Sequence, residues 1–270
     1  MSVIAARPPV AASSRGRRRR IRLVGDAAVW VFLLVFGLIW MAPFLWMVSA
    51  SFKSLPEIYA FPPTWIPKQL RWQNYVDTWQ AVPFGRFFLN SGIVAVSVTA
   101  GQVLTCSLAG YSFARLRYPG RDRIFLAYLG TMMIPFPVVM IPLFILMKDL
   151  ALVDHLPGLV LPAMFSAWGT FLMRQFMLTI PKELEEAAKI DGASLFGIYW
   201  RLFLPLSGPV IATLSIFTFL GQWNAFLWPL IMISSVDKKT LPLGLASLQA
   251  QLTAIPVSYT HLRAHETGRN

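Results

Sequence analysis

The chain has 270 residues, of which 56% are hydrophobic and 13% are charged, and its formal net charge is +12. Soluble domains usually carry about 25% charged residues, so the composition excludes an ordinary soluble domain and indicates a membrane protein. The basic residues flank long apolar segments, a pattern of membrane topology that argues against nucleic-acid binding. The single cysteine, Cys106, cannot form an intrachain disulfide and is expected to be an unreactive apolar residue.

Residues 1–25 are rich in arginine and contain no acidic residue, which predicts a disordered basic tail. A basic segment followed by an apolar one is also the pattern of a secretory signal. However, the apolar run at residues 27–50 is longer than a typical signal core, and no small-residue cleavage site follows it. We therefore predict that this run is an uncleaved first membrane-spanning helix.

Four further apolar runs follow, at about residues 87–114, 124–147, 156–173 and 205–236. A helix needs about 20 residues to cross a bilayer, and the run at 156–173 is expected to extend to residue 180. The sequence thus predicts an all-α polytopic membrane protein whose membrane domain covers residues 26–248 and contains five transmembrane helices. None of the five runs contains Asp, Glu, Lys, Arg or His. Many ion-driven carriers place such groups within the membrane, so the energy for any pumping must come from outside the bilayer.

Lysine and arginine concentrate in the tail, in the loop 115–123 and around residues 181–205. Cytoplasmic loops of membrane proteins carry an excess of these residues. We therefore expect the N-terminus and the segment 181–205 to be cytoplasmic, and the segment 51–86 to face the exterior.

The segment 181–205 is predicted to form an elbow of two helices joined at a glycine. Pro181 suits the first helical position, Gly192 suits the residue after a helix end, and Ser194 can cap the second helix. Glu183 and Glu185 fit the partial positive charge of a helix N-terminus. A flat face for docking is expected from four residues at spacings i, i+3, i+4 and i+7, namely Leu184, Ala187, Ala188 and Asp191.

The elbow resembles the EAA loop of ABC importer permeases, because Glu186-Ala187-Ala188 is followed by Gly192 and then by Leu204-Pro205. Leu202 stands where the family often has isoleucine. Motifs resembling the sugar-transporting, MalG-like branch extend the similarity over roughly residues 25–250: Asn90-Ser91, Tyr111 to Arg115, Tyr118 to Arg121, Leu161-Pro162, Trp223 to Phe226 with Pro229, and Thr240 to Pro242.

This resemblance implies a permease subunit in a bacterial inner membrane that acts with a second permease subunit, cytoplasmic ATP-binding subunits and a periplasmic or extracellular solute-binding protein. The elbow would be the coupling helix that docks on the ATPase, with Glu186, Ala187, Ala188, Asp191 and Gly192 as the coupling residues. The chain has no P-loop. We therefore expect ATP hydrolysis to occur in a partner subunit. We expect this chain itself not to be an enzyme and to bind no cofactor. The alternative for these residues is that they only cap and end an interfacial helix.

Trp223 and Asn224 are candidates for the substrate pathway, because sugar sites commonly combine aromatic faces with amide groups; packing between helices is the equal alternative. Pro135, Pro137 and Pro142 are expected to break the third span. For function, a sugar or related polyol is the expected solute. The alternatives are another solute class, such as glycerol-phosphate or peptide, and a passive channel or membrane scaffold.

Residues 249–270 depart from the family, because they are polar where a sixth span is expected to follow residue 240. From about Val257 they resemble a non-native sequence, so we expect the last span to be missing. His261 and His265 are spaced i, i+4 without a third ligand, and we expect no metal site.

Overall fold

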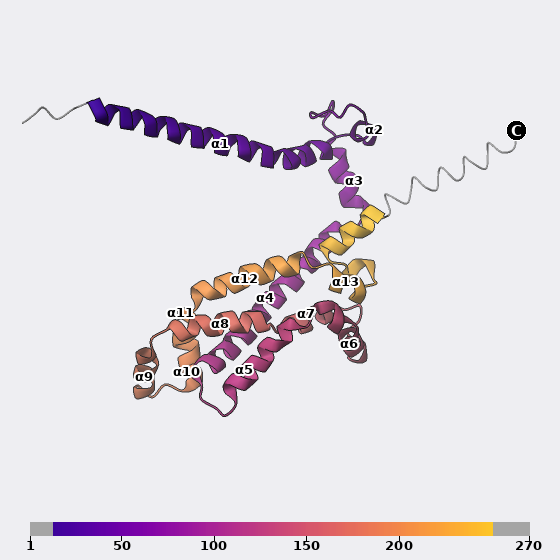
Figure 1. Cartoon of the computed structure of the whole chain (residues 1–270). Coiled ribbons are helices and arrows are strands. Elements are labelled where there is room, and N and C mark those ends of the chain that lie inside the picture. Colours follow the sequence, from indigo (N-terminus) through magenta and orange to yellow (C-terminus); the bar gives the residue numbers. More distant parts are fainter. Residues whose placement is uncertain (1–12, 251–270) are drawn as a thin grey trace, which may run out of the picture. The chain divides into compact units, whose positions relative to one another are not determined.

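A computed structural model describes residues 13–250, and every regular element within that range is a helix (Figure 1). The chain forms two compact units, residues 1–78 and 79–270. The tail prediction for residues 1–12 and the predictions about His261, His265 and the residues after 257 lie outside the described residues.

The first unit is built on the long helix α1, Ser13–Ser51, whose part Val29–Ser51 is long and apolar enough to cross a membrane. The predicted first span is therefore confirmed. The helix begins inside the range predicted as a disordered tail, which corrects that prediction from Ser13 onward. After α2, Leu55–Ile58, the chain is tied back to the end of α1, because the side-chain amide of Asn74 donates 2.9 Å hydrogen bonds to the carbonyls of Ser51 and Lys53.

The second unit is organised around α4, Phe84–Arg115, the other straight helix that is long enough to cross a membrane. Three helices pack along it: α7 (Leu156–Ala163), α8 (Ala167–Thr179) and α12 (Gly208–Trp223). The approach of α8 requires a glycine in α4, because a Cβ on Gly110 would lie 2.7 Å from the Cβ of Met173 and 3.0 Å from the backbone nitrogen of Arg174. Gly110 thus permits the close contact between α4 and α8.

Three pairs of helices form bent spans. The helix Arg121–Met133, which comprises α5 (Arg121–Gly130) and η1 (Thr131–Met133), meets α6 (Phe136–Asp149) at 102°. The helices α7 and α8 meet at 43°, and the helix Leu195–Leu206 meets α12 at 75°. Counting each pair as one span gives up to five spans with α1 and α4, which agrees with the predicted number. The break near Pro135 confirms the predicted interruption of the third span.

The fifth predicted span, 205–236, is not one helix. Its main part, α12, ends at Trp223, and a short α13, Leu227–Met232, follows after a turn. The prediction of a continuous run was wrong here because a run of apolar residues does not show where backbone hydrogen bonding stops. The short 3₁₀ helix η3, Val236–Lys238, and an apolar helix at Leu241–Ala250 complete the described chain.

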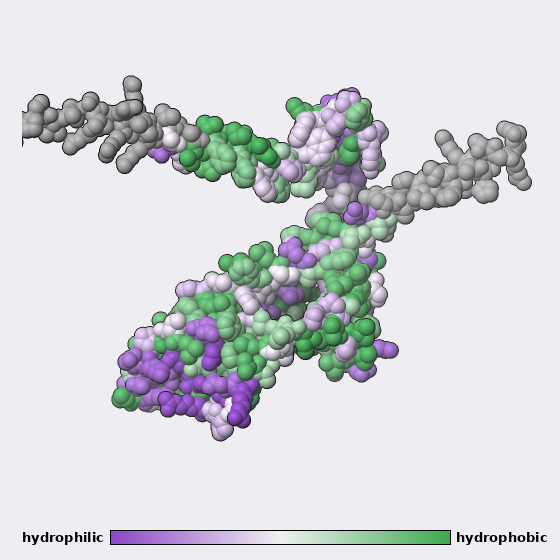
Figure 2. Space-filling model, viewed as in Figure 1, coloured by the Kyte–Doolittle hydropathy of each residue, from purple (hydrophilic) through white to green (hydrophobic). Residues whose placement is uncertain are grey.

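The elbow occupies one end of the second unit. It contains α9 (Lys182–Ile190), α10 (Leu195–Ile198), a π-helical turn η2 (Tyr199–Phe203) and α11 (Leu204–Leu206). Figure 2 shows hydrophilic residues gathered over this end, whereas hydrophobic residues dominate the side of the unit between its two ends. The unit therefore has a polar end that carries the elbow and an apolar belt of the kind that lipid covers.

Candidate functional site

The first helix of the elbow ends where the sequence predicts. The backbone of Gly192 has φ +79°, its N–H donates to the carbonyl of Lys189, and the N–H of Ala193 donates to the carbonyl of Ala188, each at 3.0 Å. This is the Schellman arrangement, in which a left-handed residue closes the helix. Pro181 lies one position earlier than predicted, as the N-cap residue of α9, and Ser194 caps α10 by accepting a 3.1 Å hydrogen bond from the N–H of Gly197.

The candidate coupling residues do not all share one face. Glu186, Ala187, Asp191 and Gly192 are exposed, whereas Ala188 is half-buried and packs against the core of the second unit. The predicted flat face containing both alanines is therefore wrong, because the boundary between core and surface runs between these two neighbours. The most exposed large side chain of α9 is Ile190, at 87%. Among the exposed residues of α9 and its C-terminal turn, we call Glu186, Ala187, Ile190, Asp191 and Gly192 the elbow surface.

A second apolar group lies exposed on α10 and η2. Phe196 and Trp200 stack with their ring centroids 6.3 Å apart, and both are more than half exposed, at 65% and 53%. The opposite side of this segment is buried against α4. There, the Tyr199 hydroxyl forms a 2.7 Å hydrogen bond with the Ser107 hydroxyl, and the Tyr111 hydroxyl donates to the carbonyl of Leu195 at 3.2 Å. The elbow therefore combines a buried anchoring side with an exposed, partly apolar side.

Sequence reasoning missed the ion pair that holds α9 against the bundle. An oxygen of the Glu185 carboxylate lies 3.7 Å from a guanidinium nitrogen of Arg115, and the two side chains are only 8% and 3% exposed. Glu185 also accepts a 2.7 Å hydrogen bond from Lys189. Glu185 was expected only to match the helix dipole. Arg115, at the end of the motif Tyr111 to Arg115, was the signal that could have indicated this pair, because a buried cation needs an anionic partner.

A pocket of about 880 Å³ lies beside α9, between this helix and the start of α5. It is lined by Arg117 of the α4–α5 loop, by Arg121 at the start of α5, and by Lys182, Glu185 and Glu186 of α9. Five of its lining side chains are cationic and two are anionic, so the wall of the pocket is electropositive.

The pathway candidates Trp223 and Asn224 lie at the end of α12, not in the middle of a helix. Asn224 is exposed, and its side-chain amide donates a 2.8 Å hydrogen bond to the carbonyl of Leu220 in its own helix. Trp223 is half-buried and packs edge to face against Phe88 of α4 at 5.0 Å. Asn224 therefore hydrogen-bonds within its own helix, because the Leu220 carbonyl also accepts its backbone N–H at 3.2 Å.

Polar side chains inside the bundle instead satisfy the break between α7 and α8. Gln102 of α4 donates to the carbonyl of Ala163 at 2.7 Å and accepts from the Thr218 hydroxyl of α12 at 2.8 Å. The Thr105 hydroxyl donates to the carbonyl of Met164 at 2.6 Å. In a membrane, carbonyls freed by a bend need such partners. A glutamine in an otherwise apolar run was the signal that could have identified this group.

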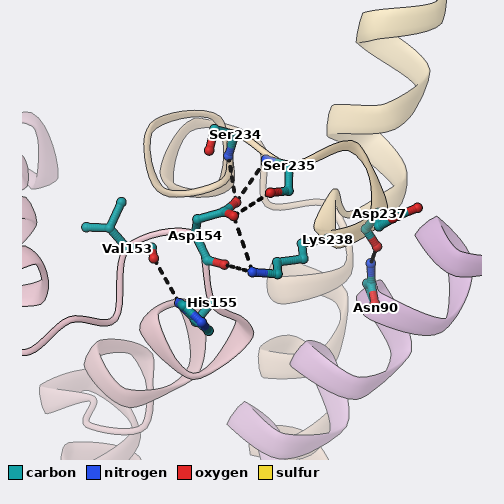
Figure 3. A network of polar contacts seen from close by, with 8 residues as sticks. All are labelled: Asn90, Val153, Asp154, His155, Ser234, Ser235, Asp237 and Lys238. Atoms are coloured by element: carbon teal, nitrogen blue, oxygen red, sulfur yellow. Dashed lines mark hydrogen bonds and ion pairs between the residues drawn. The ribbon is translucent and has the colours of Figure 1, made fainter.

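A second polar group lies at the end of the unit away from the elbow. We call it the clasp, and it is centred on Asp154, which contacts Ser234, Ser235 and Lys238 (Figure 3). The Asp154 carboxylate accepts hydrogen bonds from the backbone N–H groups of Ser234 and Ser235, from the Ser235 hydroxyl and from Lys238, at 2.5–3.2 Å. The Ser235 hydroxyl and these further donors hold the pKa of Asp154 far below its usual value. The backbone of Asp154 has φ +59°, a left-handed conformation that aspartate adopts more readily than most residues and that these contacts stabilise.

The clasp also joins two motifs that are far apart in the sequence. The Asn90 amide donates to the carbonyls of Asp237 and Lys239 at 2.9 and 3.0 Å, and the Ser91 hydroxyl accepts from the N–H of Leu241 at 2.8 Å. Asn90-Ser91 and Thr240 to Pro242 were each part of the family resemblance, and the structure brings them into contact. Within residues 13–250, no three His, Cys, Asp or Glu side chains lie close enough together to hold a metal ion.

The comparisons with known proteins agree with this architecture. The family model described as "Binding-protein-dependent transport system inner membrane component" matches residues 106–260, which is more than half of the chain. The sn-glycerol-3-phosphate transport system permease protein UgpE of Yersinia pestis bv. Antiqua (strain Antiqua) is 36% identical over 226 residues, which cover 82% of this chain and 78% of that protein. The arabinooligosaccharides transport system permease protein AraQ of Halalkalibacterium halodurans is 37% identical over 225 residues, covering 80% and 81%.

Among solved structures, a chain of a bacterial ABC transporter involved in the import of the acidic polysaccharide alginate is similar. The TM-score is 0.72 at 25% identity, over 87% of this chain and 80% of that one. The family inferred from the EAA loop is therefore confirmed by sequence and by fold. The chain belongs to the family of binding-protein-dependent transport system inner membrane components, and it is an ABC importer permease, not an enzyme.

Proposed function

We propose that this chain forms, with a second permease subunit, the membrane pathway for a sugar or related polyol, and that the elbow couples this pathway to a cytoplasmic ATP-binding subunit. In this proposal a solute-binding protein delivers the solute at the end of the second unit that carries the clasp. The N-terminus and the elbow face the cytoplasm, in line with the concentration of lysine and arginine around the elbow.

The observation that carries the proposal is the exposed elbow surface on a helix whose other side is anchored. A largely exposed Ile190 between Ala187 and Asp191 is costly to leave in water, and a partner that covers it gains apolar burial. The small side chains of Ala187 and Gly192 allow a partner backbone to come close. The stacked Phe196 and Trp200 extend the apolar area beside it.

The solute class is proposed from the named relatives. They transport sn-glycerol-3-phosphate or arabinooligosaccharides, and the structural relative imports alginate, so all three handle polyhydroxylated solutes. A glycerol-phosphate is the second candidate, because the UgpE similarity is as strong as the AraQ similarity. A solute-binding protein encoded beside this chain, tested for thermal stabilisation by arabinooligosaccharides and by glycerol-3-phosphate, separates the two.

Docking of the ATPase is tested by affinity purification of the chain co-expressed with the ATP-binding subunit and second permease. We expect Ile190→Glu and Gly192→Pro to reduce the ATPase recovered per permease, because one places a charge on the elbow surface and the other cannot adopt φ +79°. Leu178→Glu, which changes an exposed residue of α8 outside the elbow surface, is the control. Equal ATPase recovery from all variants would exclude the elbow as the docking site and favour a passive channel or scaffold.

A further inference from the structure

One side chain, Arg115, joins the first helix of the elbow, α9, to three other elements of the second unit. Arg115 is the last residue of α4, and its side chain is 3% exposed. It donates hydrogen bonds to the carbonyls of Met177, at 2.5 Å, and of Ile180, at the end of α8. Its guanidinium group also faces Glu185 of α9 and lies over the ring of Phe203 in η2, 4.8 Å from the centroid. Four elements therefore meet at a single residue.

Few residues of α9 contact the bundle, so the contact with Arg115 matters for how α9 is held. Of the nine residues of α9, Glu185 alone is buried, and Ala188 alone packs against the apolar core. The large hydrophobic side chains of α9, Leu184 and Ile190, are exposed at 43% and 87%. Besides its covalent connections to α8 and α10 and the packing of Ala188, α9 is therefore held to the bundle by the Glu185–Arg115 pair.

The end of α8 explains why an arginine is needed there. The chain turns at Ile180–Pro181, and proline has no N–H to donate to the last carbonyls of the helix. The planar guanidinium group offers several donors in a fixed geometry, so it can bind two carbonyls and a carboxylate together. Because a lysine has a single ammonium group on a flexible chain, it cannot reproduce this set of contacts.

We propose that Arg115 is the positioning residue that makes α9 move as one body with α4 and α8, so that displacement of the elbow by the ATPase reaches the membrane helices. This inference rests on the proposed function. The alternative is that Arg115 only caps the C-terminus of α8 and does not couple α9 to the bundle. The two differ in one consequence, which is whether the distance between α9 and α4 stays constant when nucleotide binds to the ATPase.

The test measures that distance in the whole complex. Nitroxide labels are placed on Glu183→Cys in α9, an exposed position outside the elbow surface, and on Leu104→Cys in α4, which is also exposed; the native Cys106 is buried and serves as the unlabelled background. Distances are recorded by double electron–electron resonance without nucleotide and with Mg-ATP and vanadate. The ATP-binding subunit retained is quantified on the same samples. Arg117→Gln is the matched control, because Arg117 is an exposed arginine two residues from Arg115.

We expect the otherwise native chain and Arg117→Gln to show one distance in both nucleotide states. In Arg115→Gln the ATP-binding subunit is retained, but the distance shifts with nucleotide by more than the width of the native distribution. Glu185→Gln should shift in the same direction by a smaller amount, because the carbonyl contacts of Arg115 remain. A constant distance in Arg115→Gln, or a distance that already changes in the native chain, would overturn the proposal.

If Arg115→Gln does not fold, Arg115→Lys and Glu185→Gln answer the same question, and constant distances in both would equally overturn it. Failure of the proposed function has a different signature. In that case no ATP-binding subunit is recovered with the native chain, or Ile190→Glu leaves its recovery unchanged.

Discussion

The Thr218 hydroxyl of α12 donates a 2.8 Å hydrogen bond to the side-chain oxygen of Gln102 in α4, and both residues are buried. The amide nitrogen of the same Gln102 binds the Ala163 carbonyl where α7 ends. One side chain thus connects three helices and satisfies a carbonyl that the bend between α7 and α8 leaves free.

We predict that Gln102→Leu lowers stability by about 1–3 kcal/mol, because it leaves the Ala163 carbonyl and the Thr218 hydroxyl without a partner. Thr218→Val alone should cost less. A double-mutant cycle measured by thermal unfolding in detergent should give a coupling of about 0.6–1.7 kcal/mol between the two residues. Additive effects would mean that the bond contributes nothing to stability.

The packing of α4 against α8 gives a paired prediction on glycine. Gly110→Ala should destabilise the protein, since its Cβ would lie 2.7 Å from the Cβ of Met173, with backbone close behind. Gly92→Ala in the same helix meets nothing within 4 Å and should stabilise by about 0.5–1 kcal/mol, as alanine favours a helix over glycine. The comparison is made by apparent melting temperature, and equal shifts for both variants would contradict the close contact.

The clasp gives a prediction on pH. The pKa of Asp154 is lowered by the Ser235 hydroxyl and its other donors, so the stabilising contribution of the carboxylate is present above the unfolded pKa, near 3.9. It is lost only as the pH falls through the lower, folded value. The clasp should therefore be unaffected between pH 8 and pH 5, as measured by proteolysis of the loop containing Ser234 and Ser235.

Asp154→Asn should weaken the clasp at every pH in that range, at a cost of about 1–2 kcal/mol, because charge-assisted hydrogen bonds become neutral ones. Faster cleavage of the loop in this variant is the expected result. Asp237→Asn is the control, since its side chain is 65% exposed and forms only a surface ion pair with Arg86. Acid-induced opening of the native clasp above pH 5 would show that the carboxylate is not held as described.

Local features of the elbow could be predicted from the sequence, because they depend on neighbouring residues. Gly192 ends α9 and Ser194 caps α10 as expected, since conformational freedom and side-chain capping act over a few positions. The number of spans followed from run length alone. The different surroundings of Ala187 and Ala188 could not be predicted from the sequence. Neighbours on a helix point about 100° apart, and only the tertiary fold decides where the core boundary lies between them.

Long-range polar contacts were the other part that the sequence did not reveal. Arg115 and Glu185, like Gln102 and Thr218, lie far apart in the chain and meet only after the helices pack. Asp154 adopts φ +59°, which its residue type does not predict. The turn between α12 and α13 was also missed, although Asn224, a residue type that favours turns, stands at the end of α12.

The central claim, that the elbow surface docks on an ATP-binding subunit, is tested most directly by photo-crosslinking in intact cells. A benzoylphenylalanine placed at Ile190 of α9 is compared with one at Val236, which is also exposed but adjoins the clasp. We predict an adduct with the ATP-binding subunit from position 190 and none from position 236. No such adduct at 190, or equal adducts from both positions, would contradict the assignment of the elbow as the docking site.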